Sequence, residues 1–228
     1  GFLGRIIPHI YSDWGFPEDI RLWTAEATLK YLTNFGVDLI GDQIVGENAA
    51  QKFLKETLQK VETSKKVNEI ANYEELANAV EKHGLPGSSA GGEHPKFLAR
   101  RISDDIPVMV KFVLKGESSI TQRRMDLLRA EHLASSILST SNLNAPTRIL
   151  EGSSYMFLEI TRFDRIGKYG RKGVISLLSL DLEFIGSGEN WSTVAQKLLE
   201  LDIINEEIAL EMQFREYFGN FIGNSDMH

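Results

Sequence analysis

The chain has 228 residues, of which 42% are hydrophobic and 25% charged, an ordinary composition for a folded protein with a hydrophobic core. Its formal charge of −7 argues against direct nucleic-acid binding, because proteins that contact the phosphate backbone usually carry a basic excess. The sequence has no cysteine and no apolar run near the roughly 20 residues of a membrane span, which argues against disulfides, thiolate metal sites and membrane partners. A cytoplasmic protein is expected.

The first part of the chain predicts a helical N-terminal subdomain over residues 1–84. Apolar residues at helical spacing predict helices over 21–35 and about 47–61. A third helix is expected to follow Asn72, an N-cap residue that begins a capping box, and to end at Gly84.

A small sheet lobe is predicted next, over residues 85–160. It opens with a loop rich in glycine and proline. Residues 107–114 read Pro-Val-Met-Val-Lys-Phe-Val-Leu, and apolar residues on both faces indicate a buried strand. The spacing predicts a helix over 121–138, and the segments 148–150 and 155–160 predict a hairpin around Gly-Ser-Ser.

The remaining residues, 161–228, predict the first part of a helical lobe. Six apolar residues of the last expected helix recur at helical spacing, which predicts a buried face: Leu210, Phe214, Tyr217, Phe218, Phe221 and Ile222. The chain begins without methionine and stops just after this helix, so we expect a piece of a longer protein. Asp226 lies in the final loop, where an aspartate can accept the proton of a substrate hydroxyl; the alternative is a polar cap of the turn.

Lys111 interrupts the apolar strand, and an ammonium in such a place is costly unless an anion meets it. Glu131 on the following helix is the expected partner, and its neighbours Leu127, Leu128 and Leu133 suggest a buried face. Kinases use a strand lysine paired with a helix glutamate to direct the lysine at the α- and β-phosphates of ATP. The alternative, which spacing alone favours, is an edge-strand lysine that reaches solvent and a surface glutamate.

The loop at 87–92 reads Gly-Ser-Ser-Ala-Gly-Gly and offers backbone N–H groups that can cradle phosphate oxygens. It precedes the strand of Lys111, which is the order of a kinase phosphate loop. It matches neither of the common glycine-rich phosphate motifs. Taken alone, it is better explained as a flexible linker between domains.

Together, these elements resemble the HipA family of bacterial serine/threonine kinases, the toxin components of HipA–HipB-type toxin–antitoxin pairs. The segments that carry the resemblance extend over nearly the whole chain: Ser88 to Lys96, Val110-Lys111-Phe112, Leu128 to Glu131, Glu159 to Arg165, and Gly223 to His228. The resemblance implies an α+β, bilobed protein-kinase-like fold with an incomplete C-terminal lobe. It implies ATP and Mg²⁺ as cofactors.

The resemblance also implies a role for individual residues. ATP would be bound by Ser88, Ser89, Ala90, Gly91, Gly92, Lys111 and Glu131, with hinge contacts from the backbone of Glu159 and Ile160. Asp226 would be the catalytic base. Ser89, with Ser88 in reserve, would be the autophosphorylation site. The family's metal ligands are expected beyond His228, so no metal residue is assigned and no phosphoryl transfer is expected from this chain alone.

The partners implied are a protein substrate, such as an aminoacyl-tRNA synthetase or another translation component, and a helix-turn-helix antitoxin. Two alternatives stay open. One is a truncated, non-catalytic fragment that binds a nucleotide or a partner. The other is a small-molecule kinase on the same fold.

Overall fold

The computed structural model describes residues 12–17, 19, 22–58, 66–67, 69–83, 95–139, 143–224 and 227. The chain forms two compact units, residues 1–173 and residues 174–228, and each is described by itself. The boundaries expected at residues 84 and 160 do not coincide with this division. The first unit contains both the sheet and the helices that precede it in the sequence.

The first unit is a mixed α/β structure. Its helices are η1 (Ser12–Trp14), α2 (Ala25–Phe35), α3 (Glu47–Leu58), α4 (Ile70–His83) and α5 (Ser119–Ser139). Its strands are β1 (Lys66–Val67), β2 (Lys96–Arg101), β3 (Pro107–Leu114), β4 (Thr147–Glu151), β5 (Tyr155–Thr161), β6 (Arg165–Ile166) and β7 (Gly170–Arg171).

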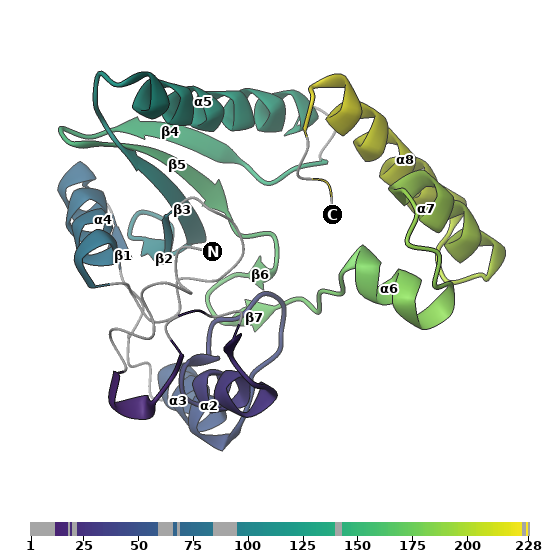
Figure 1. Ribbon diagram of the computed structural model, residues 1–228, viewed down its shortest axis with the longest axis horizontal. Coiled ribbons are helices and arrows are strands. Elements are labelled where there is room, and N and C mark those ends of the chain that lie inside the picture. Colours follow the sequence, from purple (N-terminus) through teal and green to yellow (C-terminus); the bar gives the residue numbers. More distant parts are fainter. Residues whose placement is uncertain are drawn as a thin grey trace. The chain divides into compact units, whose positions relative to one another are not determined.

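The described strands include a five-stranded sheet in the order β1-β2-β3-β5-β4, with α4 on one face and α5 on the other (Figure 1). Only the short β1 runs parallel to its neighbour β2; the other pairs are antiparallel. Because successive residues of a strand point to opposite faces, Val110 and Phe112 of β3 pack on the α4 side and Val113 on the α5 side. The α4 face of β3 is therefore buried, whereas on the α5 face Val113 is buried and Met109 and Lys111 are only partly so, and the burial expected for both faces is confirmed in part.

The start of one predicted helix differs from the structure, and one strand was not predicted. The third helix, α4, begins at Ile70, and Asn72 lies inside its first turn, where its Oδ1 accepts a hydrogen bond from the Glu69 N–H at 3.3 Å. Asn72 therefore caps the N-terminus of α4 from a position inside the helix. The strand β2 was not expected, because its six residues adjoin the glycine-rich loop and include Lys96 and two arginines.

Helix α4 is tied to the turn between β4 and β5. The Glu74 carboxylate accepts hydrogen bonds from the Ser153 hydroxyl, at 2.8 and 2.9 Å, and from the Ser154 N–H at 2.7 Å. The Tyr155 hydroxyl donates to Glu81 of the same helix at 2.9 Å. Burial, followed by the hydrogen bond and charge of Glu81, raises the pKa of Tyr155 to about 12. This hairpin end is therefore anchored to the helix.

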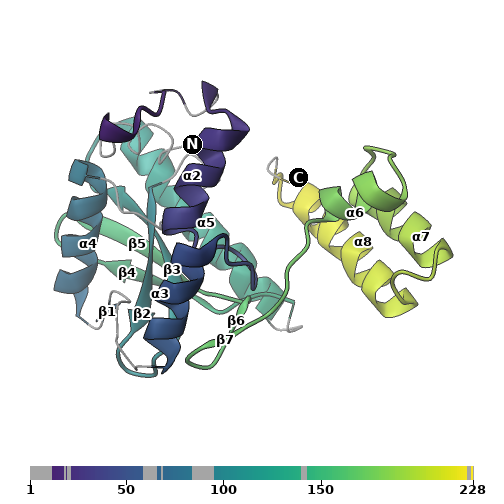
Figure 2. The same ribbon diagram turned by 90° about the horizontal axis from the view of Figure 1, so that it is seen from below.

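The second unit is helical, with α6 (Leu177–Phe184), α7 (Trp191–Glu200) and α8 (Glu206–Phe221). Figure 2 shows α7 and α8 running alongside each other. The buried Glu216 of α8 accepts a hydrogen bond from the Ser192 N–H at the start of α7, at 2.8 Å. None of the described helices of either unit has both the length and the apolar character needed to cross a membrane.

The predicted buried face of α8 is wrong. Most of its members are exposed, namely Leu210, Phe214, Tyr217, Phe221 and Ile222. The buried residues of the helix are Ala209, Glu216 and Gly219. Helical spacing identified an apolar stripe correctly, but α7 packs along another side of α8.

Candidate functional site

Lys111 and Glu131 meet on the face of the sheet that α5 covers. The Lys111 Nζ lies 2.6 Å from Glu131 Oε1 and 2.8 Å from Oε2. The predicted ion pair is therefore present, but its predicted burial is not, because the two side chains are 22% and 40% exposed. The exposure has a simple cause: Leu127 and Leu133, expected to bury this side of the helix, are themselves exposed.

The pair has an apolar floor and an open side. Met125 and Leu128 of α5 pack on Met156 and Leu158 of β5, which fixes the helix on the sheet. A lysine ammonium has three N–H donors, and among the described residues only Glu131 accepts from Lys111. A partly exposed cation with spare donor capacity, held in place by a carboxylate, can bind a phosphate oxygen. The residues present therefore fit the phosphates of a nucleotide.

On the opposite face of the sheet, Glu159 is the centre of a closed polar cluster. Its buried carboxylate accepts hydrogen bonds from the Tyr73 hydroxyl and from Arg148, whose Nε and Nη2 lie at 2.7 and 2.9 Å. Arg101 Nε lies 3.6 Å from the same carboxylate. Burial, followed by the hydrogen bond and charge of Glu159, raises the pKa of Tyr73 above its usual range. The Glu159 side chain therefore joins α4 to the sheet.

The hinge contacts expected from Glu159 and Ile160 do not fit their place in the sheet. Both residues lie inside β5 and pair on each side, Glu159 with Val110 and Arg148, and Ile160 with residues of β3 and β4. A residue in a central antiparallel strand uses its N–H and C=O in the ladder. Neither residue therefore has free backbone groups for an adenine. The chain leaves the sheet two residues later, at Arg162.

The other predicted site residues lie outside the part of the chain that the structure describes. They are the loop residues Ser88, Ser89, Ala90, Gly91 and Gly92, and the predicted base Asp226. Their roles stay predictions. Within the described residues, no group of three or more histidines, aspartates or glutamates is arranged to hold a metal ion.

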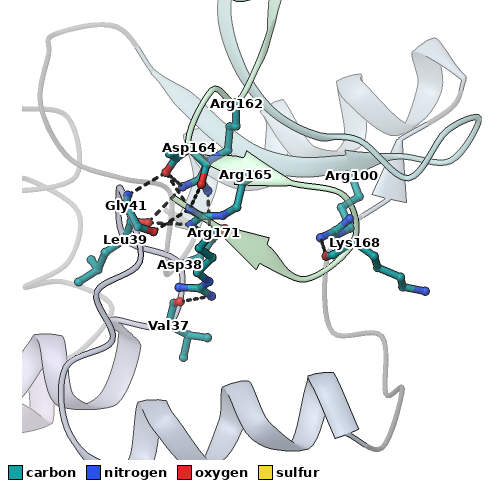
Figure 3. Close-up of polar contacts among 10 residues, drawn as sticks. All are labelled: Val37, Asp38, Leu39, Gly41, Arg100, Arg162, Asp164, Arg165, Lys168 and Arg171. Atoms are coloured by element: carbon teal, nitrogen blue, oxygen red, sulfur yellow. Dashed lines mark hydrogen bonds and ion pairs between the residues drawn. The ribbon is translucent and has the colours of Figure 1, made fainter. Parts of the chain in front are cut away.

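A polar cluster that no sequence pattern predicted lies where β5 ends, and we call it the arginine clamp: Asp38, Arg162, Asp164, Arg165 and Arg171 (Figure 3). The Asp164 carboxylate accepts hydrogen bonds from Arg162 at 2.7 and 3.0 Å and from Arg165 at 2.7 Å. Asp38 accepts from both of these arginines, at 2.7 and 2.6 Å. The Arg-Phe-Asp-Arg segment, residues 162–165, belongs to the resemblance described above. Asp38, the partner of its two arginines, is too distant in sequence to be inferred.

The clamp also binds the backbone of residues 37–41. Arg165 donates to the carbonyl oxygens of Leu39 and Gly41 at 2.7 and 2.8 Å, and the Gly41 N–H donates to Asp164 at 2.9 Å. Burial alone would raise the pKa of Asp164. Hydrogen bonds from Arg162 and Gly41, together with the charges of both arginines, outweigh burial and lower this pKa to about 2. Asp164 is therefore a carboxylate at all ordinary pH values.

With this geometry established, comparison with known proteins points to a class of bacterial toxins. Residues 1–54 match the family model described as "YjjJ-like toxin, middle domain". The chain is 34% identical over 233 residues to the protein "Toxin YjjJ" of Escherichia coli (strain K12). The alignment covers 100% of this chain and 52% of that protein, so the chain spans about half the length of the relative it matches. No solved structure matches.

These matches support the expected relationship to a toxin family. The names they give are YjjJ-like, and they do not name HipA.

Proposed function

We propose that this chain is part of a HipA-like, cytoplasmic serine/threonine kinase that acts as the toxin of a toxin–antitoxin pair. The observation that carries the kinase assignment is the ion pair between Lys111 and Glu131, at 2.6 Å. The toxin assignment is supported by the similarity to Toxin YjjJ.

The position of the pair in the topology supports the same function. Lys111 lies in β3, a central strand, and Glu131 lies on α5, the helix that connects β3 to β4 and packs on β5. Protein kinases require a strand lysine paired with a glutamate of the helix that follows, because the pair sets the position of the ATP phosphates. Exposed ion pairs contribute little to stability, so a contribution to stability does not explain why this pair is present.

Each residue has a defined task in this proposal. Lys111 binds the α- and β-phosphates, Glu131 orients its ammonium, and the loop at 88–92 covers the phosphates with backbone N–H groups. Asp226 accepts the proton of the substrate hydroxyl. Bound Mg²⁺ neutralises charge on the phosphates, and we assign none of its ligands to this chain.

The proposed substrate is a serine or threonine of a protein, such as an aminoacyl-tRNA synthetase or another translation component, and the proposed regulator is a helix-turn-helix antitoxin. Phosphorylation of Ser89 would place roughly −1.5 to −2 charges in a loop that holds ATP phosphates, and repulsion would then switch the kinase off.

The test is ATP binding by calorimetry in the presence of Mg²⁺, with the wild-type chain and two lysine variants. Lys111→Met should weaken ATP binding about tenfold to a hundredfold, because a charge-assisted hydrogen bond contributes about 1.5 to 3 kcal/mol. Lys115→Met is the matched control: Lys115 directly follows β3, pairs with Glu151 at 2.7 Å and is 32% exposed. It should leave the ATP affinity unchanged. Equal affinities for the two variants would exclude the phosphate role of Lys111.

A second measurement separates a kinase from the alternatives. In a version extended to the length of the relative, transfer of labelled γ-phosphate to the proteins of a cell extract supports a protein kinase. Transfer only to small molecules would indicate a metabolite kinase. If ATP binds but no transfer occurs even in a version extended to the length of the relative, the non-catalytic interpretation holds.

A further inference from the structure

The segment that leaves β5 is held by its polar side chains while its one aromatic residue faces outward. Arg162, Asp164 and Arg165 have side chains only 8%, 3% and 6% exposed. Phe163, which lies between them, is 63% exposed. The charged side chains of the segment are therefore buried in the arginine clamp, whereas the Phe163 side chain is accessible to a ligand.

The backbone of the same segment is fixed at both ends. The Arg162 N–H donates to the Pro107 carbonyl oxygen and the Lys172 N–H donates to the Asp164 carbonyl oxygen, each at 3.0 Å. Arg171 donates to the Val37 carbonyl oxygen at 2.7 Å, and its guanidinium lies 4.5 Å from the Phe53 ring centre. Guanidinium groups are planar and bind with fixed directions, so this network leaves the backbone little freedom.

The clamp is also anchored from the sheet. Arg100 of β2 donates to the carbonyl oxygen of Lys168, in the turn between β6 and β7 (Figure 3). The exit segment and the hairpin that follows it are thus held by residues 37–41 and by β2.

The sheet register relates this segment to Lys111. Lys111 pairs with Leu158, and Val108 pairs with Thr161, so the end of β5 lies three residues along the strand from the lysine. At the rise of a β-strand this is about 10 Å. A nucleoside triphosphate whose phosphates lie at Lys111 can place its base at about this reach. Glu159 and Ile160 are used in the ladder, and the Arg162 N–H is bonded to Pro107, so the backbone of Phe163 is the first in the exit segment that could read the base.

We infer that the arginine clamp is a positioning device that fixes the exit segment for recognition of the adenine base, without contacting the nucleotide itself. Phosphate binding at Lys111 does not depend on it. This inference rests on the proposed nucleotide-binding function. Its specific consequence is that loss of the clamp separates recognition of the base from recognition of the phosphates.

The experiment compares two probes, Mg-ATP and Mg-tripolyphosphate, which share phosphates and differ in the nucleoside. The variants are Asp164→Asn, Asp38→Asn and Arg165→Lys, each checked for native circular dichroism. Asp164→Asn should weaken ATP binding by about tenfold or more, as expected when a binding group is misplaced by about 1 Å, and should change tripolyphosphate binding by less than about twofold. Lys111→Met should weaken both probes. Asp126→Asn, which removes an exposed carboxylate of α5, should change neither.

Each other result overturns the inference in a distinguishable way. Equal losses for both probes would make the clamp a merely structural element. Unchanged ATP binding in Asp164→Asn, or equal affinity of the wild-type chain for the two probes, would show that no base is read through the clamp. A wild-type chain that binds neither probe would contradict the proposed function itself. If Asp164→Asn does not fold, Asp38→Asn and Arg165→Lys decide, because Asp38 is 43% exposed and lysine keeps the charge of Arg165.

Discussion

The charged groups on the two faces of the central sheet differ in their burial and in their number of partners. On the face under α5, Lys111 and Glu131 form a two-member pair that is open to solvent on one side. On the face under α4, Glu159 is 2% exposed and its carboxylate is saturated by Tyr73 and Arg148. Lys111 and Glu159 come from adjacent strands, β3 and β5, so the difference lies in the face of the sheet from which each side chain projects.

The comparison separates charges that build the structure from charges that are available for chemistry. Taking a charge out of water costs several kcal/mol, and a buried carboxylate must recover this cost from its partners. A partly exposed pair loses little hydration free energy on folding, and it contributes little to stability. Saturation and burial therefore mark Glu159 as structural, and the incomplete saturation of Lys111 is what its proposed role as a phosphate ligand requires.

Glu159→Gln should have the largest effect on stability. The variant weakens the hydrogen bonds from Arg148 and Tyr73 to a buried carboxylate, while Arg148 itself stays 42% exposed, so the free energy of unfolding should fall by about 2 to 3 kcal/mol. Urea unfolding followed by circular dichroism measures this. Glu151→Gln is the control, because Glu151 is 49% exposed in the neighbouring strand β4. A loss below about 1 kcal/mol in Glu159→Gln would break the comparison.

Acid should reveal the same principle at Asp164, a second saturated carboxylate. Its pKa is lowered from 3.8 to about 2 in the folded chain, so folding is favoured while the group is ionised. This stabilisation is complete above the unfolded pKa and disappears as the pH falls through the folded pKa. Between about pH 4 and pH 2, the wild-type chain should lose about 2 kcal/mol more than Asp164→Asn does. Parallel losses in urea titrations of the two proteins would contradict a saturated clamp.

Glu131→Gln should have the smallest effect on stability and a clear effect on binding. Because its pair with Lys111 is partly exposed, the free energy of unfolding should change by less than about 1 kcal/mol. The affinity for ATP should fall several-fold, since the ammonium loses the carboxylate that orients it. Unfolding and calorimetry on the same samples measure both quantities. A large loss of stability with unchanged affinity would reverse the roles assigned to the two faces.

Local sequence patterns predicted the parts of the fold that depend on local physics. The strand predicted over residues 107–114 has the bounds observed for β3, because apolar residues at both odd and even positions of a short segment indicate a strand with neighbours on both faces. The hairpin of β4 and β5 followed from its turn residues. The apolar stripe of α8 was identified, but which side of a helix becomes buried depends on neighbours that periodicity does not specify.

Local sequence patterns also predicted part of the candidate site, namely the pair of Lys111 and Glu131. A lone lysine in an apolar strand signals a need for a partner, and Glu131 lies one element away. Other contacts join residues much farther apart in the chain: Tyr73 is separated from Glu159 by 86 positions, and Asp38 from Arg162 by 124. Such contacts are set by tertiary packing. Local patterns therefore could not show that Glu159 bonds Tyr73, or that Asp38 completes the arginine clamp.

The bond between Glu74 and the β4–β5 turn determines where a tag or fluorescent reporter can be inserted. Tips of β-hairpins commonly tolerate insertions. Here a side chain added at Gly152 would meet Glu74 Oε1 at 2.5 Å, and an insertion would pull Ser153 and Ser154 away from α4. The exposed turn at Leu201 and Asp202, between α7 and α8, is the better position for a label in this chain.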